Sequence, residues 1–260
     1  MSRGIKQHRI AEHLCLSLAL KQYQRILDTP WESLGPVGVE SFLTSAILLS
    51  VLTFPLLDSD TGYDQSTSWV FGQCEDLKGW LALQAGLKTL LVSMRLYFNE
   101  TRSSLGQTIF GTDDRKWPTP NFKLDMKVLP ESWIKTCNLN DPWSVDAFGR
   151  AIGIVRELRN IEPIRSNVLR NLLFVWKMQK RFRILLCKKD ERAIWLYGYW
   201  LGLLCRYEEV WWCVERVRRD YQAICMFYDQ LRLHERPGSE GESWVEMVNE
   251  LKLAPFCVYI

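Results

Sequence analysis

The chain has 260 residues, of which 47% are hydrophobic and 24% are charged. These are the proportions of a globular protein with a sizeable core, and they exclude a largely disordered chain. The net charge is +3, from 33 basic and 30 acidic side chains, which is too balanced to indicate nucleic-acid binding through charge alone.

Three helices are expected in the N-terminal part. Residues 10–27 are amphipathic, and Thr29-Pro30 ends their helix because proline disfavours a helical residue before it. Residues 39–54 are apolar, but the uncharged run is short for a membrane span, carries hydroxyl groups and ends at Pro55. It therefore favours a buried core helix. A third helix opens at Glu75, where a carboxylate suits the positive end of the helix dipole.

Proline and glycine then interrupt the pattern. Residues 99–142 contain four prolines and two glycines, which predicts an irregular connector. It joins N-terminal helices within residues 5–98 to C-terminal helices within residues 143–253. We expect all of them to form a single domain, residues 1–260, because apolar residues of the connector such as Trp133 need burial.

Helical patterns resume after the connector. Ser144 is a candidate N-cap for a helix that ends near residue 160. Pro163 fits the first turn of the next helix, which is expected to continue to Cys187. A further helix starts at Asp190-Glu191 and has no charge from residue 193 to 205, so it should be buried on all sides.

The last long helix has the cleanest pattern. Apolar residues from 208 to 233 recur in steps of three and four, with Glu215 and Arg219 expected to pair on the other face. A short helix, residues 242–253, follows. Since no strand pattern has comparable strength, the sequence predicts an all-α single helical-bundle domain of about seven to nine helices.

Metal chemistry and secretion have little support. The eight cysteines include no CxxC pair, and the three histidines are far apart, so no metal site and no cofactor are expected. Free cysteines in apolar stretches are typical of a reducing compartment. Residues 1–7 are followed by no apolar run, so we expect no signal peptide and a nuclear or cytoplasmic location.

Four stretches carry a family resemblance in the correct order. They are HLCLSLALKQYQRIL, VESFLTSAILLSVLTFPLLD, SWVFGQCEDLKGWLALQAGLKTLL and WKMQKRFRILLCKKDERAIWLYGYWLGLLCRYEEVWWCVERVRRDYQAI. Together they resemble the regulatory region of fungal zinc-cluster transcription factors of the sterol uptake control type. The anchors in the last stretch are Trp176, Phe182, Leu185, Leu186, Ala193, Tyr199, Leu203, Trp211, Trp212 and Ile224.

The resemblance implies an all-helical regulatory domain that binds a lipophilic small molecule, a homodimer or heterodimer partner, or both. The zinc-cluster DNA-binding module needs six closely spaced cysteines, which this chain lacks, so we expect no direct nucleic-acid binding. Gln84-Ala85 and Arg192 also stand where the family has Arg and Pro. Through the resemblance, the candidate walls of a ligand pocket are Trp80, Trp176, Trp195, Tyr199, Trp211 and Trp212.

Each of these features has a plainer interpretation. The aromatic residues also suit a filled core. Gly198 and Gly202 either allow a neighbouring helix to approach closely or leave room for a ligand. The basic side chains that fall on roughly one helix face form either a solvated surface or an anion site; they are Arg170, Lys177, Arg181 and Lys188.

A biosynthetic enzyme is the alternative function. Apolar helices with many aromatics suit a terpene cyclase acting on an isoprenoid. Such enzymes hold magnesium and diphosphate with acidic clusters, for which the chain offers only partial matches. These are Asp113-Asp114, the spacing Asn99, Ser103 and Gln107, and the acidic turn Asp58, Asp60 and Asp64. A transcription factor whose zinc cluster lies upstream of this sequence is a third possibility.

Overall fold

The computed structural model describes residues 14–15, 17–26, 28–29, 31–56, 65–72, 75–93, 124–207 and 214–257. Within these ranges the regular structure is helical and contains no strand, so the predicted all-α fold is confirmed. A helical segment at residues 17–26 comes first. The α-helices that follow are α2 (Trp31–Leu56), α3 (Glu75–Ser93), α6 (Glu131–Thr136), α7 (Pro142–Arg159), α8 (Val168–Lys177), α9 (Lys180–Cys187), α10 (Glu191–Leu204), α11 (Val214–Leu231) and α12 (Ser239–Leu253).

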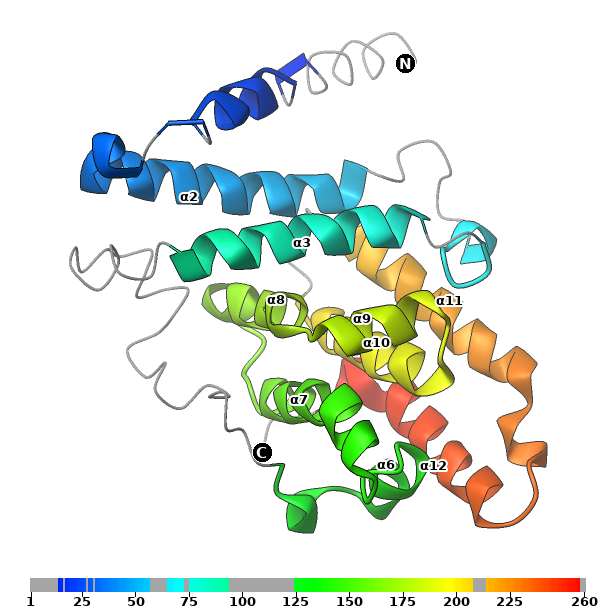
Figure 1. Ribbon diagram of the computed structural model, residues 1–260. Coiled ribbons are helices and arrows are strands. Elements are labelled where there is room, and N and C mark those ends of the chain that lie inside the picture. The colour runs from blue at the N-terminus through cyan, green and yellow to red at the C-terminus, as the bar shows by residue number, and fades with distance from the viewer. Residues whose placement is uncertain are drawn as a thin grey trace, which may run out of the picture.

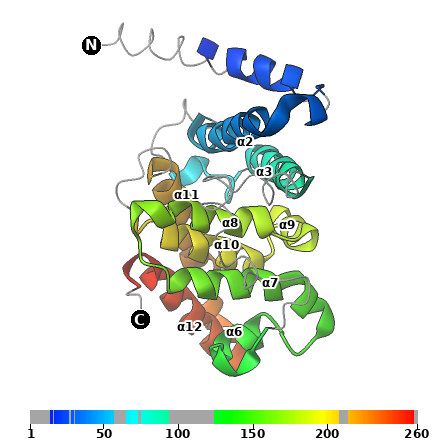
Figure 2. The ribbon, with the colours of Figure 1, turned by 90° about the vertical axis from the view of Figure 1, so that its left-hand side faces the viewer.

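Short 3₁₀ turns connect several of these helices. They are η1 (Gln65–Thr67), η2 (Met126–Val128), η3 (Arg165–Asn167), η4 (Leu233–Glu235) and η5 (Ala254–Phe256). The helices stack from one end of the molecule to the other, and both views show the same order (Figures 1 and 2). Segment 17–26 lies outermost, α2 and α3 follow, α8 to α10 form the middle, and α6 and α12 lie at the opposite end. The N-terminal helices are therefore at an edge of the stack.

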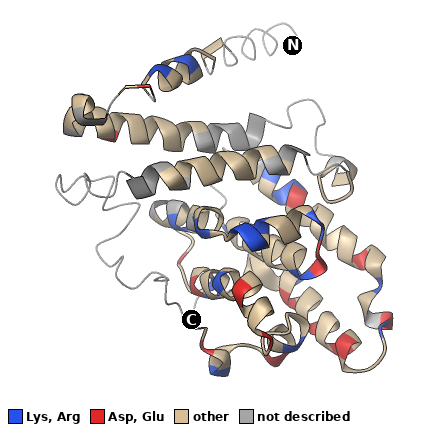
Figure 3. Ribbon diagram, viewed as in Figure 1, with Lys and Arg blue, Asp and Glu red and all other residues tan. Residues whose placement is uncertain are grey.

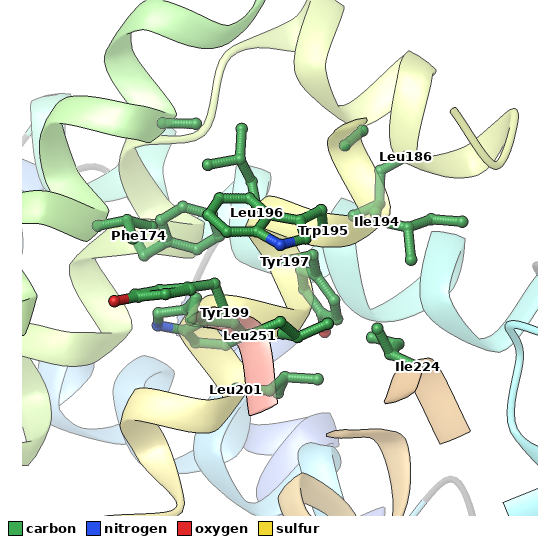
Figure 4. Packing of buried hydrophobic residues seen from close by; sticks show 14 of the residues in the cluster. Phe174, Leu186, Ile194, Trp195, Leu196, Tyr197, Tyr199, Leu201, Ile224 and Leu251 are labelled. Carbon is green, nitrogen blue, oxygen red and sulfur yellow. The ribbon is translucent and has the colours of Figure 1, made fainter. Parts of the chain in front are cut away.

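Helix α10 is the centre of the core. It contacts α7, α8, α9, α11, α12 and η5, and every side chain from Ala193 to Leu204 is buried. Its neighbours enclose it with apolar side chains such as Phe174, Leu186 and Ile224 (Figure 4). Asp190 caps the helix by accepting hydrogen bonds from the backbone N–H groups of Arg192 and Ala193. The uncharged run thus marks a helix that is buried on all sides, as predicted.

The two glycines of α10 serve close packing. A Cβ atom at Gly198 would lie 2.7 Å from Cγ2 of Ile224, and one at Gly202 would lie 2.6 Å from Cβ of Ala254. Both distances are below van der Waals contact. Helix α11 approaches α10 at Gly198, and η5 approaches it at Gly202. The alternative, that the glycines leave room for a ligand, is wrong.

Helix α2 is longer than expected and only half buried. It begins at Trp31, well before residue 39, and a kink at Gly35 (φ 63°, ψ 174°) separates its first turn. Positive φ costs glycine little, so the residue tolerates the kink. The apolar residues Val39, Phe42, Leu43, Ala46, Ile47 and Leu49 are buried, so the described part of the expected core helix packs into the core, while Val37 and Leu48 on its outer face are exposed. None of the described helices combines the length and apolar character needed to cross a membrane.

The expected helix from Pro163 to Cys187 is wrong, because the structure divides it into η3, α8 and α9. The break between α8 and α9 falls at Met178 and Gln179, whose ψ angles of 131° and 155° are extended. The Met178 side chain is buried there. Neither residue is a helix breaker by type, so local preference does not explain the break.

Two details of the connector also differ from expectation. Its described part, residues 124–142, is not irregular throughout, because it contains η2 and α6. Trp133 of α6 is buried, which explains why this segment folds onto the core. Helix α7 is capped by Asp141, whose carboxylate accepts from the backbone N–H of Ser144. Ser144 is therefore inside the helix and is not its N-cap.

Helix α11 carries a buried ion cluster that includes Arg219, which the sequence predicted to lie on the face opposite the apolar stripe. Arg219 is buried and donates to Oδ1 of Asp220, which also accepts a hydrogen bond from Ser68. Arg216, also buried, lies 3.5 Å from the other carboxylate oxygen. The apolar stripe itself is confirmed at Val217 and Ile224, which are buried.

Candidate functional site

The two predicted wall residues of α10 lie against each other inside a filled core. The ring centroids of Trp195 and Tyr199 are 5.1 Å apart. Trp133 of α6 lies beside both, with centroid distances of 4.9 Å and 5.6 Å. The indole N–H of Trp195 donates to the carbonyl oxygen of Met247, so its polar group is satisfied. The space next to these two rings is occupied by the chain's own aromatic side chain.

Trp80 and Trp176 lie between α3 and the middle layer, away from that cluster. The Trp80 ring stacks on Trp200 with a centroid distance of 6.5 Å. The indole N–H of Trp176 donates to Oε1 of Gln84 at 2.6 Å, and both side chains are buried. The described candidates thus lie in separate places rather than along the wall of one pocket: Trp195 and Tyr199 with Trp133, Trp80 with Trp200, and Trp176 against Gln84. Trp211 and Trp212 lie outside the described residues.

The four basic candidates do not share one helix face. Arg170 and Lys177 belong to α8, Arg181 belongs to α9, and Lys188 follows the end of α9. Because α8 and α9 are separated by the break described above, the spacing of a continuous helix does not apply. Arg181 also forms an ion pair with Asp146 of α7. The prediction of a shared face is therefore wrong.

The partial metal motifs of the enzyme alternative cannot be placed. Asp58, Asp60, Asp64, Asn99, Ser103, Gln107, Asp113 and Asp114 all lie outside the described residues. Within the described part of the chain, no group of three or more His, Cys, Asp and Glu side chains is arranged to hold a metal ion.

An apolar surface is uncovered at the N-terminal end of the stack. On the outermost helical segment the side chains of Leu14 and Leu18 are 59% and 57% exposed. They are four residues apart and thus share a helix face. The segment contacts α2 by stacking Tyr23 on Phe42 at a centroid distance of 4.7 Å. Its leucines are therefore not the residues that hold it in place.

Helix α2 exposes an uncharged stripe next to this segment. Val37 and Leu48 are 79% and 54% exposed, with Ser41 and Ser45 between them at helical spacing. The Ser45 hydroxyl donates to the carbonyl oxygen of Ser41, so it is satisfied within the helix. Residues 41–56 contain no charge. The described residues of α2 show one red stretch and no blue in Figure 3. We call Leu14, Leu18, Val37, Ser41, Ser45 and Leu48 the N-terminal apolar surface.

A second site lies at the opposite end, where α6, α10 and α12 meet. It is a pocket of about 450 Å³ lined by Thr136, Lys189, Asp190, Glu191, Arg192, Arg236, Glu240 and Trp244. We call it the charged pocket. The sequence analysis missed it, because its residues come from three distant parts of the chain. The only signal was the charged run before α10, which was interpreted as a solvated face or an anion site.

Ion pairs organise the charged pocket. Nη2 of Arg192 lies 2.8 Å from Oδ2 of Asp190, and hydrogen bonding to this carboxylate raises the pKa of Arg192. Arg236 bridges two helices by pairing with Glu191 at 2.7 Å and with Glu240 at 2.9 Å. Hydrogen bonding to Glu191 likewise raises the pKa of Arg236. Both guanidinium groups therefore stay charged at any physiological pH.

Comparison with known proteins gives no relative. No family model, no curated protein and no solved structure matches the chain.

Proposed function

We propose that this chain is a non-catalytic binding domain that associates with a second copy of itself through the N-terminal apolar surface. The observation that carries the proposal is the exposure of Leu14 and Leu18 on an amphipathic helical segment at the edge of the stack. An amphipathic helix normally buries its apolar face. Exposed apolar side chains that share one helix face are characteristic of interaction sites.

A second copy suits this surface better than a charged partner does. The exposed stripe of α2 has no charge, and its Ser45 hydroxyl is satisfied internally. The α2 stripes of two copies can meet without placing like charges together, whereas Leu14 and Leu18 share their face with the exposed Lys21 and Arg25, which a partner must accommodate. The small side chains of Ser41 and Ser45 also allow two helices to approach closely. A two-fold dimer uses the same patch on both copies, which requires a surface that complements itself.

The dimer partner was one of two binding modes implied by the family resemblance. The other, a lipophilic guest at the aromatic walls, receives less support, because Trp133 fills the space beside Trp195 and Tyr199. Regulation of transcription stays a prediction from the resemblance. The terpene-cyclase alternative also stays a prediction.

Sedimentation velocity of the whole chain tests the proposal. Leu18→Glu places a charge in the N-terminal apolar surface. A two-fold dimer contains this surface once on each copy, so the substitution affects the interface twice. Losing the burial of a leucine on each copy should weaken dimerisation by about 100-fold or more. Leu253→Glu is the matched control, because Leu253 is 59% exposed and ends α12, which lies at the opposite end of the stack from α2 (Figures 1 and 2). A wild-type monomer, or equal weakening by both variants, would refute the proposal.

A further inference from the structure

The charged pocket offers a second binding site that is independent of self-association. It is formed by α6, α10, α12 and the turns before α10 and α12, none of which belongs to the N-terminal apolar surface. Its volume is about 450 Å³, and its lining is polar or charged except for Trp244. Trp244 is buried beneath Arg236, whose guanidinium carbon is 5.9 Å from the indole centroid, so one wall is rigid.

The charges around the pocket balance. Lys189, Arg192 and Arg236 face three carboxylates, those of Asp190, Glu191 and Glu240. The Lys189 ammonium donates to the carbonyl oxygen of Gly72, which holds it at the rim. The Arg192–Asp190 and Arg236–Glu191 pairs are each about one-third exposed or less. A ligand that enters must therefore exchange partners with existing ion pairs.

One polar group in the lining has no partner. The Thr136 hydroxyl oxygen is buried and forms no hydrogen bond with any described residue. Thr136 is the last residue of α6, and its hydroxyl does not bond back to the helix carbonyl four residues earlier. A buried hydroxyl without a partner is costly, and a rotation of the Thr136 side chain that turns the oxygen toward the pocket would let a ligand group pair with it.

We propose that the charged pocket binds a small zwitterion of the free amino-acid class. A carboxylate and an ammonium group on one ligand can replace both members of an internal ion pair. A purely anionic ligand would take a guanidinium and leave a partly buried carboxylate without its partner, which is unfavourable. A purely cationic ligand would take a carboxylate and leave a partly buried guanidinium without its partner. Charge balance in the pocket thus favours charge balance in the ligand.

Thermal unfolding and calorimetry of the whole chain test this proposal. The probes are the free proteinogenic L-amino acids, with acetate, methylammonium and inorganic phosphate as singly functional comparisons. At least one amino acid with a small polar side chain should raise the Tm and give a measurable Kd, while the comparisons should not. The proposal is overturned if no amino acid raises the Tm, or if acetate or phosphate raises it equally, which would indicate an anion site.

Two variants test whether the ligand binds in the charged pocket. Thr136→Val removes only the unpartnered hydroxyl, so it should fold at least as well as the wild type and weaken binding about 5-fold. Glu240→Gln removes a charge that is 58% exposed and should weaken binding about 10-fold. Lys252→Gln, which breaks the distant pair with Asp229, is the control and should leave the Kd unchanged. Unchanged affinity in both pocket variants would overturn the assignment.

Discussion

Replacing Gly202 with alanine tests the packing of the central helix. The added Cβ would lie 2.6 Å from Cβ of Ala254 and 3.1 Å from Cε2 of Tyr221. Ala254 has no rotatable side chain, so α10 and η5 must separate by about 1 Å to restore normal contact. Such overpacking costs about 1–3 kcal/mol. Alanine is the better helix former by about 1 kcal/mol, which offsets part of this cost.

We therefore expect Gly202→Ala to lower the free energy of unfolding by about 1 kcal/mol, the middle of the packing cost less the gain in helix preference. Gly86→Ala in α3 is the matched control, because nothing lies within 4 Å of its added Cβ. There the helix preference acts alone, and the variant should be more stable by up to about 1 kcal/mol. Urea unfolding followed by circular dichroism measures both. If Gly202→Ala equals or exceeds the wild type in stability, α10 does not pack closely against η5.

Substitutions at Asp141, Ser144, Cys205 and Asp220 test the helix cap, the buried thiol and the buried ion cluster, each by urea unfolding. Asp141→Ala should cost about 1 kcal/mol as the loss of a helix cap, and a larger cost for Ser144→Ala would contradict the observed cap. Burial raises the pKa of Cys205 from 9.0 to about 12. The stabilisation that the folded state gains by keeping this thiol protonated is therefore full below pH 9 and is lost as the pH rises from 9 to 12. Cys205→Val should reduce the stability lost between pH 8 and 10 by about 1.4 kcal/mol, and an unchanged loss would mean that the thiol is solvated. Asp220→Ala should destabilise by about 3–5 kcal/mol, because two buried arginines share that carboxylate, and a cost under about 1 kcal/mol would place the cluster at the surface.

The sequence predicted the features that depend on composition along one helix. The uncharged run from residue 193 to 205 identified the buried central helix, because burial on all sides excludes charge. The spacing of Gly198 and Gly202 likewise pointed to close packing. Asp190 was identified at the start of α10 because carboxylates favour helix N-termini. These signals are local and need no knowledge of the partner helix.

Features that depend on distant contacts could not be predicted. The break at Met178 has no proline or glycine to signal it, and the Met178 side chain is buried. Trp133 was expected to be buried, but its position beside Trp195 and Tyr199 depends on how α6 docks. The charged pocket needs Thr136, Arg192 and Arg236 to meet, and their spacing in sequence carries no such pattern.

The exposed outer helices show the limit of hydrophobicity as a signal. The apolar run of α2 was expected to be core because burial is the commonest fate of such a run. The structure buries its inner face and leaves Val37 and Leu48 exposed. An exposed apolar stripe and a buried one have the same composition, so only the positions of neighbouring helices distinguish them. This difference turned an expected core helix into a candidate interface.

The molar mass of the wild-type chain in solution tests the central claim most directly. Size-exclusion chromatography with multi-angle light scattering, run over a range of loading concentrations, should give about twice the chain mass of 30.5 kDa at the highest loading. A mass that stays at 30.5 kDa at every concentration would contradict self-association through the N-terminal apolar surface.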